Sequence, residues 1–380
     1  MSQNAWLDAD SPRVGLGCMR LTDAGIGERV AIDTIAAAVE SGITVFDTAH
    51  SYGPSADAAG DKERVLARAL RACGGAGRAR VVTKGGMTRH RAAWIADGRA
   101  SSLQSQCQAS LSALDGLPID LYLVHAPDPR TPWRTTVRAL AKLLDAGMVR
   151  HVGVANVSRV QLDQARDIVA ISAVEVPLSP FSDRAFRDGL VDDCASNGMT
   201  VLAHAPLGGP ARVARLSRDP VLVQIAARHC VGPAEIALAW LLDVSSVIIP
   251  IPGARRPETA RSVAHAAAVR LSAEERHLLR TSLGYARPAR RDVMRAHGDS
   301  EVVLIAGVPG AGKSRMATRY VSDGYRRLNR DERGGSIRAL TQALDDLMRS
   351  GTKHVVMDNT WGSRAARADA LQVAHAHGAS

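Results

Sequence analysis

Residues 43–55 read ITVFDTAHSYGPS, an apolar run that ends at Asp47 and passes into a loop with Gly and Pro. Such a short β-branched run predicts a buried strand, and Tyr52 follows it within the loop. The preceding residues 28–41 place Ile32, Ile35 and Val39 at three-to-four spacing, which predicts a helix with one apolar face. Alternating strands and helices are typical of α/β proteins with a parallel sheet.

The same alternation extends over roughly the first 250 residues. Further helices are predicted at residues 62–72, 101–114, 135–145 and 233–242, with Gly42, Gly147 and Gly198 placed as left-handed C-caps. Eight strands are predicted in all. They end near Gly17, Asp47, Lys84, His125, Asn156, Val176, His204 and Pro250. Eight such units predict a closed (β/α)8 TIM barrel rather than an open sheet.

Catalytic groups of parallel barrels lie at the C-terminal ends of the strands. Asp47, Lys84 and His125 each end a predicted strand, and Tyr52 follows the first of them. Reduction of a carbonyl by hydride needs a proton donor at the developing alkoxide. An ammonium favours the phenolate of a nearby tyrosine, a carboxylate holds that ammonium, and a histidine can bond the substrate oxygen. These residue types therefore suit carbonyl reduction.

The chain resembles the aldo-keto reductase family over about residues 14–280. The segments that carry the likeness occur in the family's order: FDTAHSYGPS, VVTKGG, IDLYLVHAPDP, GMVRHVGVANVS, VLAHAPLGG and IIPIPGARRPET. The resemblance implies NADPH-dependent reduction of an aldehyde or ketone to an alcohol. It implies that Tyr52 is the general acid and that Lys84 lowers the pKa of Tyr52. It further implies that Asp47 pairs with Lys84 and that His125 orients the small carbonyl substrate.

Taken singly, each of these residues has an ordinary structural explanation, such as a strand cap, a buried core histidine or a loop residue. Their combination at the family's spacing favours the catalytic interpretation.

The resemblance also implies contacts to the cofactor NADP(H). Asn156 matches the family's carboxamide-binding Asn, but Glu175 stands at the position of a Gln. A carboxylate can accept a hydrogen bond from the amide nitrogen, yet it cannot donate one to the carbonyl oxygen. Leu178 occupies a position where an aromatic ring often stacks on the nicotinamide, with Phe181 nearby.

Two loops are predicted to bind the cofactor's phosphates. Pro206, Leu207 and Gly208 resemble the loop that covers the pyrophosphate, although an ordinary turn explains them too. Gly253, Arg255 and Arg256 precede a helix predicted to start near Pro257. A helix N-terminus with two guanidinium groups suits the adenosine 2′-phosphate, which favours NADP(H) over NAD(H). The alternative is a solvent-facing Arg pair.

A second unit is predicted after the barrel. We divide the chain into residues 1–285 as the barrel, an Arg-rich linker at 286–299, and a small P-loop α/β domain at 300–380. The sequence GVPGAGKS follows a predicted strand and matches G-x-x-x-x-G-K-S. In this motif backbone N–H groups surround the phosphates of ATP. The residues concerned are Gly307, Gly310 and Gly312, with Lys313 reaching the β/γ-phosphates and Ser314 ligating Mg²⁺.

Two later segments, YRRLNRDERGG and HVVMDNTWGSRAAR, resemble P-loop kinases of the polynucleotide kinase type. That likeness implies Asp331 as the base toward a nucleic-acid 5′-hydroxyl and Asp358 near the metal or the acceptor. The alternative is that both are surface loop carboxylates. A kinase of this type has further strands and an arginine-bearing lid, so we expect the unit to be incomplete. A fragment, a natural truncation and a nucleotide-binding remnant all remain open.

Composition adds broad limits. The net charge of +10 is dispersed, with 12 Lys/Arg against 8 Asp/Glu in residues 300–380, so it fits phosphate ligands without establishing nucleic-acid binding. Five separated cysteines without a CxxC pair predict reduced thiols in a cytoplasmic protein. The N-terminus lacks a secretory pattern, and no apolar run nears the ~20 residues that cross a bilayer. We therefore expect no membrane partner.

Three hypotheses follow. The first is an NADPH-dependent reductase with a P-loop appendage. The second is a bifunctional protein whose main role is 5′-hydroxyl kinase activity. The third is a non-catalytic NADPH-binding sensor, which Glu175 and Leu178 favour slightly. The identity of the carbonyl compound, the oligomeric state and any coupling between the units stay open.

Overall fold

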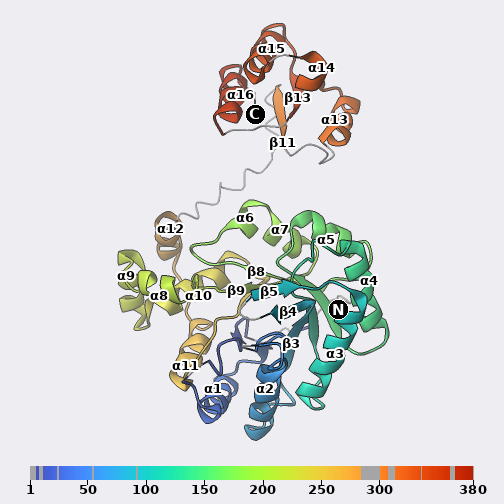
Figure 1. Ribbon diagram of the computed structural model, residues 1–380. Coiled ribbons are helices and arrows are strands. Elements are labelled where there is room, and N and C mark those ends of the chain that lie inside the picture. Colours follow the sequence, from blue (N-terminus) through green and yellow to red (C-terminus); the bar gives the residue numbers. More distant parts are fainter. Residues whose placement is uncertain are drawn as a thin grey trace. The chain divides into compact units, whose positions relative to one another are not determined.

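The protein is described here by a computed structural model, which forms two compact units, Met1–Ala286 and Arg287–Ser380 (Figure 1). The described residues are 6–7, 12–23, 25–53, 55–90, 93–283, 300–306, 313–334, 336–359 and 364–379. The predicted linker at residues 286–299 and the glycines Gly307, Gly310 and Gly312 lie outside the described residues.

Eight parallel strands form the sheet of the first unit. They are β1 (Gly15–Gly17), β2 (Val45–Asp47), β3 (Arg80–Gly85), β6 (Leu121–Val124), β7 (His151–Ala155), β8 (Ala173–Pro177), β9 (Thr200–His204) and β10 (Ile248–Pro250). Their order in the sheet follows the chain. The sheet closes because Gly17 N donates to Pro252 O at 2.9 Å and bridges to Gly253 beyond β10. The predicted (β/α)8 barrel is confirmed, and each predicted strand end is correct to within one residue.

Helices encircle these strands (Figure 1). They are α1 (Glu28–Glu40), α2 (Asp61–Ala72), α3 (Ala100–Leu114), α4 (Trp133–Asp145), α5 (Arg159–Arg166), α6 (Arg184–Arg187), α7 (Leu190–Ser196), α8 (Pro210–Leu216), α9 (Pro220–His229), α10 (Pro233–Val244), α11 (Pro257–Ala266) and α12 (Ala273–Ser282). The five predicted helices are correct to within two residues at either end. Gly42, Gly147 and Gly198 have φ angles of 89°, 66° and 67°, as predicted for left-handed C-caps.

Within the described residues no single helix is long and apolar enough to cross a bilayer. Helices α9 and α10 pass such a test only as a pair, which is bent by 91° at its break.

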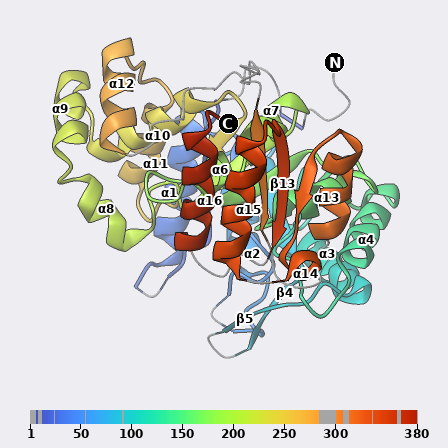
Figure 2. The same cartoon turned by 90° about the horizontal axis from the view of Figure 1, so that it is seen from above.

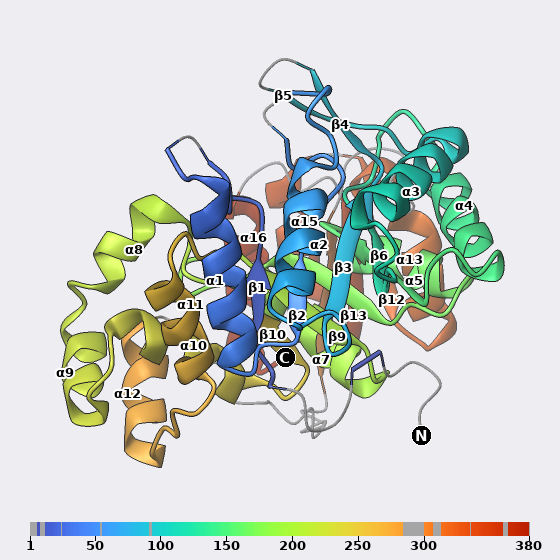
Figure 3. The same ribbon diagram turned by 90° about the horizontal axis from the view of Figure 1, so that it is seen from below.

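An antiparallel hairpin follows β3 and interrupts the βα repeat. Its strands are β4 (Met87–His90) and β5 (Ala93–Ala96). Figures 2 and 3 show it projecting away from the rest of the first unit. Strand periodicity did not predict this hairpin, because its bulky apolar side chains do not alternate along both strands. It continues directly from the C-terminal end of β3, so it stands at the mouth of the barrel.

The interior of the barrel is filled from its N-terminal end. Val45, Val82, Leu121 and Leu202 belong to an apolar cluster inside the sheet, and Trp6 packs onto it with only 4% of its surface exposed. Trp6 Nε1 donates to Thr200 Oγ1 at 3.1 Å, and Thr200 is the first residue of β9. Because this end is closed by apolar side chains, the polar groups lie at the opposite, C-terminal end.

The second unit is a three-stranded parallel sheet with helices on both faces. Its strands are β11 (Glu301–Ala306), β12 (Arg326–Leu328) and β13 (His354–Asn359), in the order β11-β13-β12. Its helices are α13 (Lys313–Ser322), α14 (Arg330–Arg333), α15 (Ile337–Arg349) and α16 (Arg364–Ala376). Val355 and Met357 pack toward α15 and α16, whereas Val356 packs on Ala317 of α13. This alternation is the period of two expected of a strand buried on both faces.

Candidate active site

Lys84 lies at the centre of a buried polar cluster at the C-terminal end of the barrel. Its Nζ donates to Asp47 Oδ1 at 2.5 Å, to Thr48 O at 3.0 Å and to Tyr52 Oη at 3.2 Å. Its side chain is fully buried. Strand β3 supplies the lysine, and β2 with its following loop supplies the other three groups. The structure therefore brings together Asp47, Tyr52 and Lys84 as the sequence predicted.

The ammonium of Lys84 is kept charged by carboxylates. Burial alone acts to lower the pKa of Lys84, because a buried charge is costly. The negative charges of Asp47 and Glu175 outweigh burial, so the pKa of Lys84 lies well above its ordinary value. Lys84 is therefore an ammonium at any physiological pH.

The sequence predicted that the pKa of Tyr52 is lowered, but in the structure this pKa is raised. Burial raises the pKa of Tyr52 above its ordinary value, and the charge of Lys84 opposes this effect without cancelling it. Lys84 acts in the expected direction, but desolvation of the phenolate is the larger effect and cannot be read from the sequence. In this state Tyr52 keeps its proton. Since its oxygen already accepts from Lys84, its own O–H group is available for another acceptor.

His125 directly follows β6 and faces Tyr52. The centroids of the two rings are 5.7 Å apart at 79°, and Ser51 Oγ lies 3.4 Å from His125 Nδ1. Burial, and after it the charge of Lys84, lowers the pKa of His125 to about 3. The imidazole is therefore neutral and has one donor and one acceptor nitrogen.

Trp94 completes this group and was missed in the sequence. It lies on β5, and its ring centroid is 6.1 Å from that of Tyr52 and 5.7 Å from that of His125. The guanidinium of Arg89 on β4 stacks over its indole at 4.1 Å. The only sequence signal was a tryptophan shortly after the strand that carries Lys84. Trp94 forms an apolar wall beside the tyrosine and the histidine.

Glu175 lies in the same cluster, at the third position of β8. Its side chain is 3% exposed, and its Oε2 is 3.2 Å from Lys84 Nζ. Despite this short distance, Oε2 has no hydrogen-bond partner within the described part of the chain. Burial and then the charge of Glu175 raise the pKa of Asp47 to about 7, and burial raises the pKa of Glu175. One ammonium is thus shared by two buried carboxyl groups.

Asn156, the predicted carboxamide ligand, lies beside this cluster. It follows β7 in a left-handed conformation with φ 57°. Its Nδ2 donates to His125 O at 3.0 Å, and its Oδ1 lies 3.1 Å from His204 Nε2. Its backbone N–H donates to Glu175 O at 2.9 Å. Asn156 and Glu175 are therefore neighbours.

The predicted pyrophosphate loop follows β9. It contains Pro206, Leu207 and Gly208. A Cβ atom on Gly208 would lie 2.5 Å from the ring of Phe181, so this loop packs closely on Phe181. The same ring faces the guanidinium groups of Arg212 and Arg215 at 5.0 and 5.4 Å. Leu178 is fully buried in the core and is not exposed to a ligand.

The predicted 2′-phosphate residues line a cavity. Its volume is about 550 Å³, and its walls are Gly25, Ile26, Val30, Gly253, Arg255, Arg256 and Thr259. Helix α11 begins at Pro257 with Arg256 as its N-cap residue. Both arginines are exposed. The structure thus places Gly253, Arg255 and Arg256 together at a helix N-terminus, where the peptide dipoles favour an anion.

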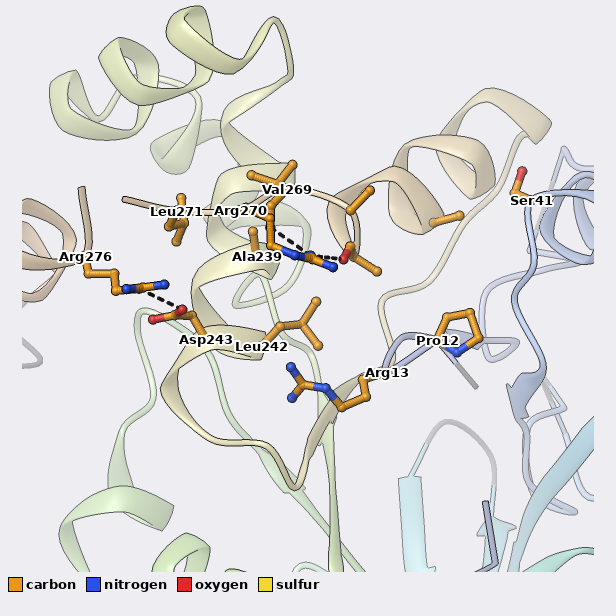
Figure 4. A pocket seen from close by; sticks show the side chains of 13 residues that line it. Pro12, Arg13, Ser41, Ala239, Leu242, Asp243, Val269, Arg270, Leu271 and Arg276 are labelled. Atoms are coloured by element: carbon orange, nitrogen blue, oxygen red, sulfur yellow. Dashed lines mark hydrogen bonds and ion pairs between the residues drawn. The ribbon is translucent and has the colours of Figure 1, made fainter. Parts of the chain in front are cut away.

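Another cavity, of about 650 Å³, lies away from these residues (Figure 4). Arg13 and Asp243 on its wall lead into β1 and β10, so it opens at the N-terminal end of the barrel. Arg13 donates to Ser245 O, Arg270 to Ala267 O and Arg276 to Asp243. Each of these arginines therefore bonds to another residue of the barrel unit. None of the described residues around Lys84 lines this cavity.

Comparison with known proteins decides the family. The model described as "Aldo/keto reductase family" matches residues 13–282. The chain belongs to the aldo/keto reductase family. The match ends with α12, so residues 300–380 lie beyond it.

Individual relatives agree with this assignment. "Probable aldo-keto reductase 1" of Glycine max is 29% identical over 293 residues, covering 69% of this chain and 83% of that protein. A thermostable aldo-keto reductase in complex with the inhibitor epalrestat is 28% identical, with a TM-score of 0.60, covering 71% of this chain and 95% of that one. An aldo/keto reductase from Klebsiella pneumoniae in complex with NADP and acetate is 26% identical, with a TM-score of 0.60, covering 71% and 90%.

The second unit has a polar group of its own. Lys313 is the first residue of α13, and Ser314 Oγ lies 3.4 Å from Asp358 Oδ2 at the end of β13. Arg327 on β12 donates to both oxygens of Asp358, at 2.9 and 2.7 Å. Burial acts to raise the pKa of Asp358, but the bonds from Arg327 outweigh it and lower this pKa. Ser314 and Asp358 are thus brought together around an ionised carboxylate.

Asp331 is not part of that group. Its side chain is exposed on α14 and lies 3.9 Å from Arg330. Within the described residues it makes no hydrogen bond or ion pair to Ser314 or Asp358. Its predicted role as a base, like the rest of the P-loop interpretation, stays a prediction.

The neutrality of His125 can be tested directly. Because the charge of Lys84 is one cause of the lowered pKa of His125, we expect Lys84→Met to raise that pKa. His151 is the internal control, since burial, Asp120 and Arg150 set its pKa and Lys84 does not. Long-range ¹H–¹⁵N NMR spectra of the imidazoles over a pH series measure both. An unchanged titration of His125 in the variant contradicts the electrostatic account.

Proposed function

We propose that this aldo/keto reductase uses NADPH to reduce an aldehyde or ketone to the alcohol. The observation that carries the proposal is the buried contact of Lys84 with Tyr52 and Asp47 at the mouth of the barrel. It combines a proton donor with a fixed cation that stabilises the donor's conjugate base. The NADP in the Klebsiella pneumoniae relative supports the choice of cofactor.

Tyr52 is the proton donor in this proposal. NADPH, when bound, supplies the hydride that reaches the carbonyl carbon. The O–H proton of Tyr52 passes to the carbonyl oxygen, and the Tyr52 phenolate is left facing Lys84 Nζ at 3.2 Å. Asp47 holds Lys84 in place at 2.5 Å, so the charge is positioned before the reaction. Although burial keeps the pKa of Tyr52 high, the ammonium reduces the energy of the phenolate that must form.

His125 orients the substrate in this proposal. Its neutral imidazole can donate one hydrogen bond to the carbonyl oxygen without adding a second positive charge. Trp94 and Tyr52 flank the same space with aromatic surface, which excludes water from the carbonyl group. The hairpin that carries Trp94 therefore contributes to the choice of carbonyl compound.

The residues present fit NADP(H). Arg255 and Arg256 supply the cations for a 2′-phosphate at the N-terminus of α11. Pro206, Leu207 and Gly208 cover the pyrophosphate. In this proposal Asn156 and Glu175 hold the carboxamide, and Glu175 Oε2 is a buried oxygen without a hydrogen-bond partner among the described residues.

Turnover separates the reductase from the NADPH-binding sensor. We expect the chain to oxidise NADPH when mixed with a panel of reactive aldehydes. Lys84→Met should lower kcat by about 10²–10⁴-fold, the usual contribution of general acid catalysis. NADPH binding, measured by fluorescence quenching, should be retained in this variant. Tight NADPH binding by the wild type without turnover on any aldehyde would favour the sensor instead.

Cofactor choice is tested at the arginine pair. We expect the double variant Arg255→Ser/Arg256→Ser to raise the KM for NADPH by roughly 10–100-fold, from the loss of charge-assisted bonds worth about 1.5–3 kcal/mol. The KM for NADH should stay the same, because NADH lacks the 2′-phosphate. Arg228→Ser, at an exposed arginine on α9, is the matched control. Equal changes for NADH and NADPH in the double variant would contradict this assignment.

We propose as a second candidate that the C-terminal unit binds ATP with Mg²⁺ and phosphorylates a nucleic-acid 5′-hydroxyl. The observation in favour is the contact between Ser314 and Asp358. Ser314 follows Lys313 at the start of α13, and Asp358 lies near the C-terminal end of the parallel strand β13. A hydroxyl and a carboxylate at this distance are suitable oxygen ligands for Mg²⁺.

Transfer of labelled phosphate tests the second candidate. Full-length protein with γ-labelled ATP and a 5′-hydroxyl oligonucleotide should yield labelled oligonucleotide, and Lys313→Ala should abolish it. The lysine is the residue that neutralises the transferred phosphoryl group. Equal transfer by wild type and variant, or none by either, rejects the kinase.

A further inference from the structure

Glu175 is placed in the barrel so that it faces the same ammonium as Asp47. The two carboxylate oxygens lie 3.2 and 2.5 Å from Lys84 Nζ, so they are no more than 5.7 Å apart, the sum of these distances. Both side chains are about 3% exposed. Two buried carboxylates around one ammonium carry an excess negative charge, which a low-dielectric interior disfavours.

The surroundings do not compensate for this charge. The titratable groups facing Glu175 and Asp47 come from the strands and loops around the barrel mouth: Cys18, Tyr52, Lys84, His125 and His204. Burial lowers the pKa of His125 to about 3 and that of His204 to about 4, so neither histidine is charged. Burial raises the pKa values of Cys18 and Tyr52, so both keep their protons. When the two carboxyl groups bind one proton, a single carboxylate remains to balance the positive charge of Lys84.

Geometry decides which of the two carboxyl groups holds that proton. Asp47 accepts a short, aligned bond from Lys84, and a charge-assisted bond of this kind stabilises the ionised form. Glu175 Oε2 has no such bond within the described residues, since the three donors of Lys84 go to Asp47, Thr48 and Tyr52. Adding the proton to Glu175 Oε2 therefore breaks no hydrogen bond from Lys84, whereas adding it to Asp47 would weaken one. Asp47 stays ionised and paired with Lys84.

We propose that Glu175 binds the nicotinamide carboxamide of the cofactor as a neutral carboxylic acid. A protonated carboxyl group has one donor and one acceptor, as has the edge of a primary amide. It can accept from the carboxamide nitrogen and donate to the carboxamide oxygen, which a carboxylate cannot do. Glu175 is thus a cofactor-positioning residue of this chain. The inference rests on the proposed NADPH-dependent function.

Proton uptake follows from this assignment. Burial raises the pKa of Asp47 to about 7 in the free protein and also raises the pKa of Glu175, so the two carboxyl groups give up their shared proton near or above neutral pH. Cofactor binding at higher pH must then return one proton to Glu175. The affinity for NADPH should fall by about tenfold per pH unit above pH 7.5, where the phosphates are already fully ionised.

Calorimetry of NADPH binding tests the proposal without turnover. Full-length wild type, Glu175→Gln and Glu63→Gln are titrated with NADPH between pH 7.5 and 9, in buffers with different ionisation enthalpies. Glu63 is the matched control, because it is also a fully buried carboxyl group but bonds to Thr83 and not to Lys84. The number of protons taken up is obtained from the dependence of the heat on the buffer.

Wild type and Glu63→Gln should take up about one proton at pH 8.5 and bind more weakly as the pH rises. Glu175→Gln should take up none, and its affinity should stay constant at the value that wild type approaches at low pH. Equal proton uptake by Glu175→Gln and wild type overturns the inference, as does loss of binding in a folded Glu175→Gln protein. If Glu175→Gln does not fold, Glu175→Met is used, and retained proton uptake there has the same meaning. Binding by neither wild type nor variants rejects the NADPH-dependent function itself, and the inference with it.

Discussion

The ion pair between Lys84 and Asp47 is the interaction on which the polar end of the barrel depends. A buried ammonium without partners costs several kcal/mol, so Lys84 is tolerated only where carboxylates surround it. Asp47 comes from the neighbouring strand β2, whereas Glu175 comes from β8, separated from β3 by two other strands in the sheet. Closure of the barrel is what brings the second carboxyl group to the lysine. The position of two carboxyl groups beside one lysine therefore depends on the closed barrel.

The apolar interior beneath the cluster gives these charges their effect. Trp6 and the strand residues around it fill the N-terminal end of the barrel, so water does not reach Lys84 from below. In such an environment electrostatic interactions are stronger than in water, and uncompensated charges are avoided. The same burial that keeps His125 neutral also keeps Tyr52 protonated. A proton donor and a neutral hydrogen-bonding imidazole therefore arise from one cause, whereas the carboxylates beside Lys84 keep its cation charged against that same burial.

Sequence reasoning predicted the parts of this site that follow from strand periodicity. Asp47, Lys84 and His125 could be placed together because each ends an apolar run, and parallel strands of a barrel end at a common rim. Trp94 was missed because β4 and β5 lack an alternating apolar pattern. The contact of Glu175 with Lys84 depends on side chains meeting across the barrel, which no local pattern encodes. The net pKa shift of Tyr52 depends on burial, a quantity that the sequence does not give.

In each unit a cationic side chain on one strand contacts a buried carboxylate on the neighbouring strand, but the two pairs differ in what they can do. Arg327 bonds both oxygens of Asp358, and a guanidinium cannot release its proton under physiological conditions. This carboxylate keeps its charge, and the lone pairs that Arg327 leaves free on its oxygens can still accept from Ser314 or ligate a metal. Lys84 instead donates its three N–H bonds to three different groups, which are Asp47 Oδ1, Thr48 O and Tyr52 Oη. One of the three donors of Lys84 thus faces a group that changes its charge, so the pair in the barrel is suited to proton transfer and the pair in the second unit to holding β12 and β13 together.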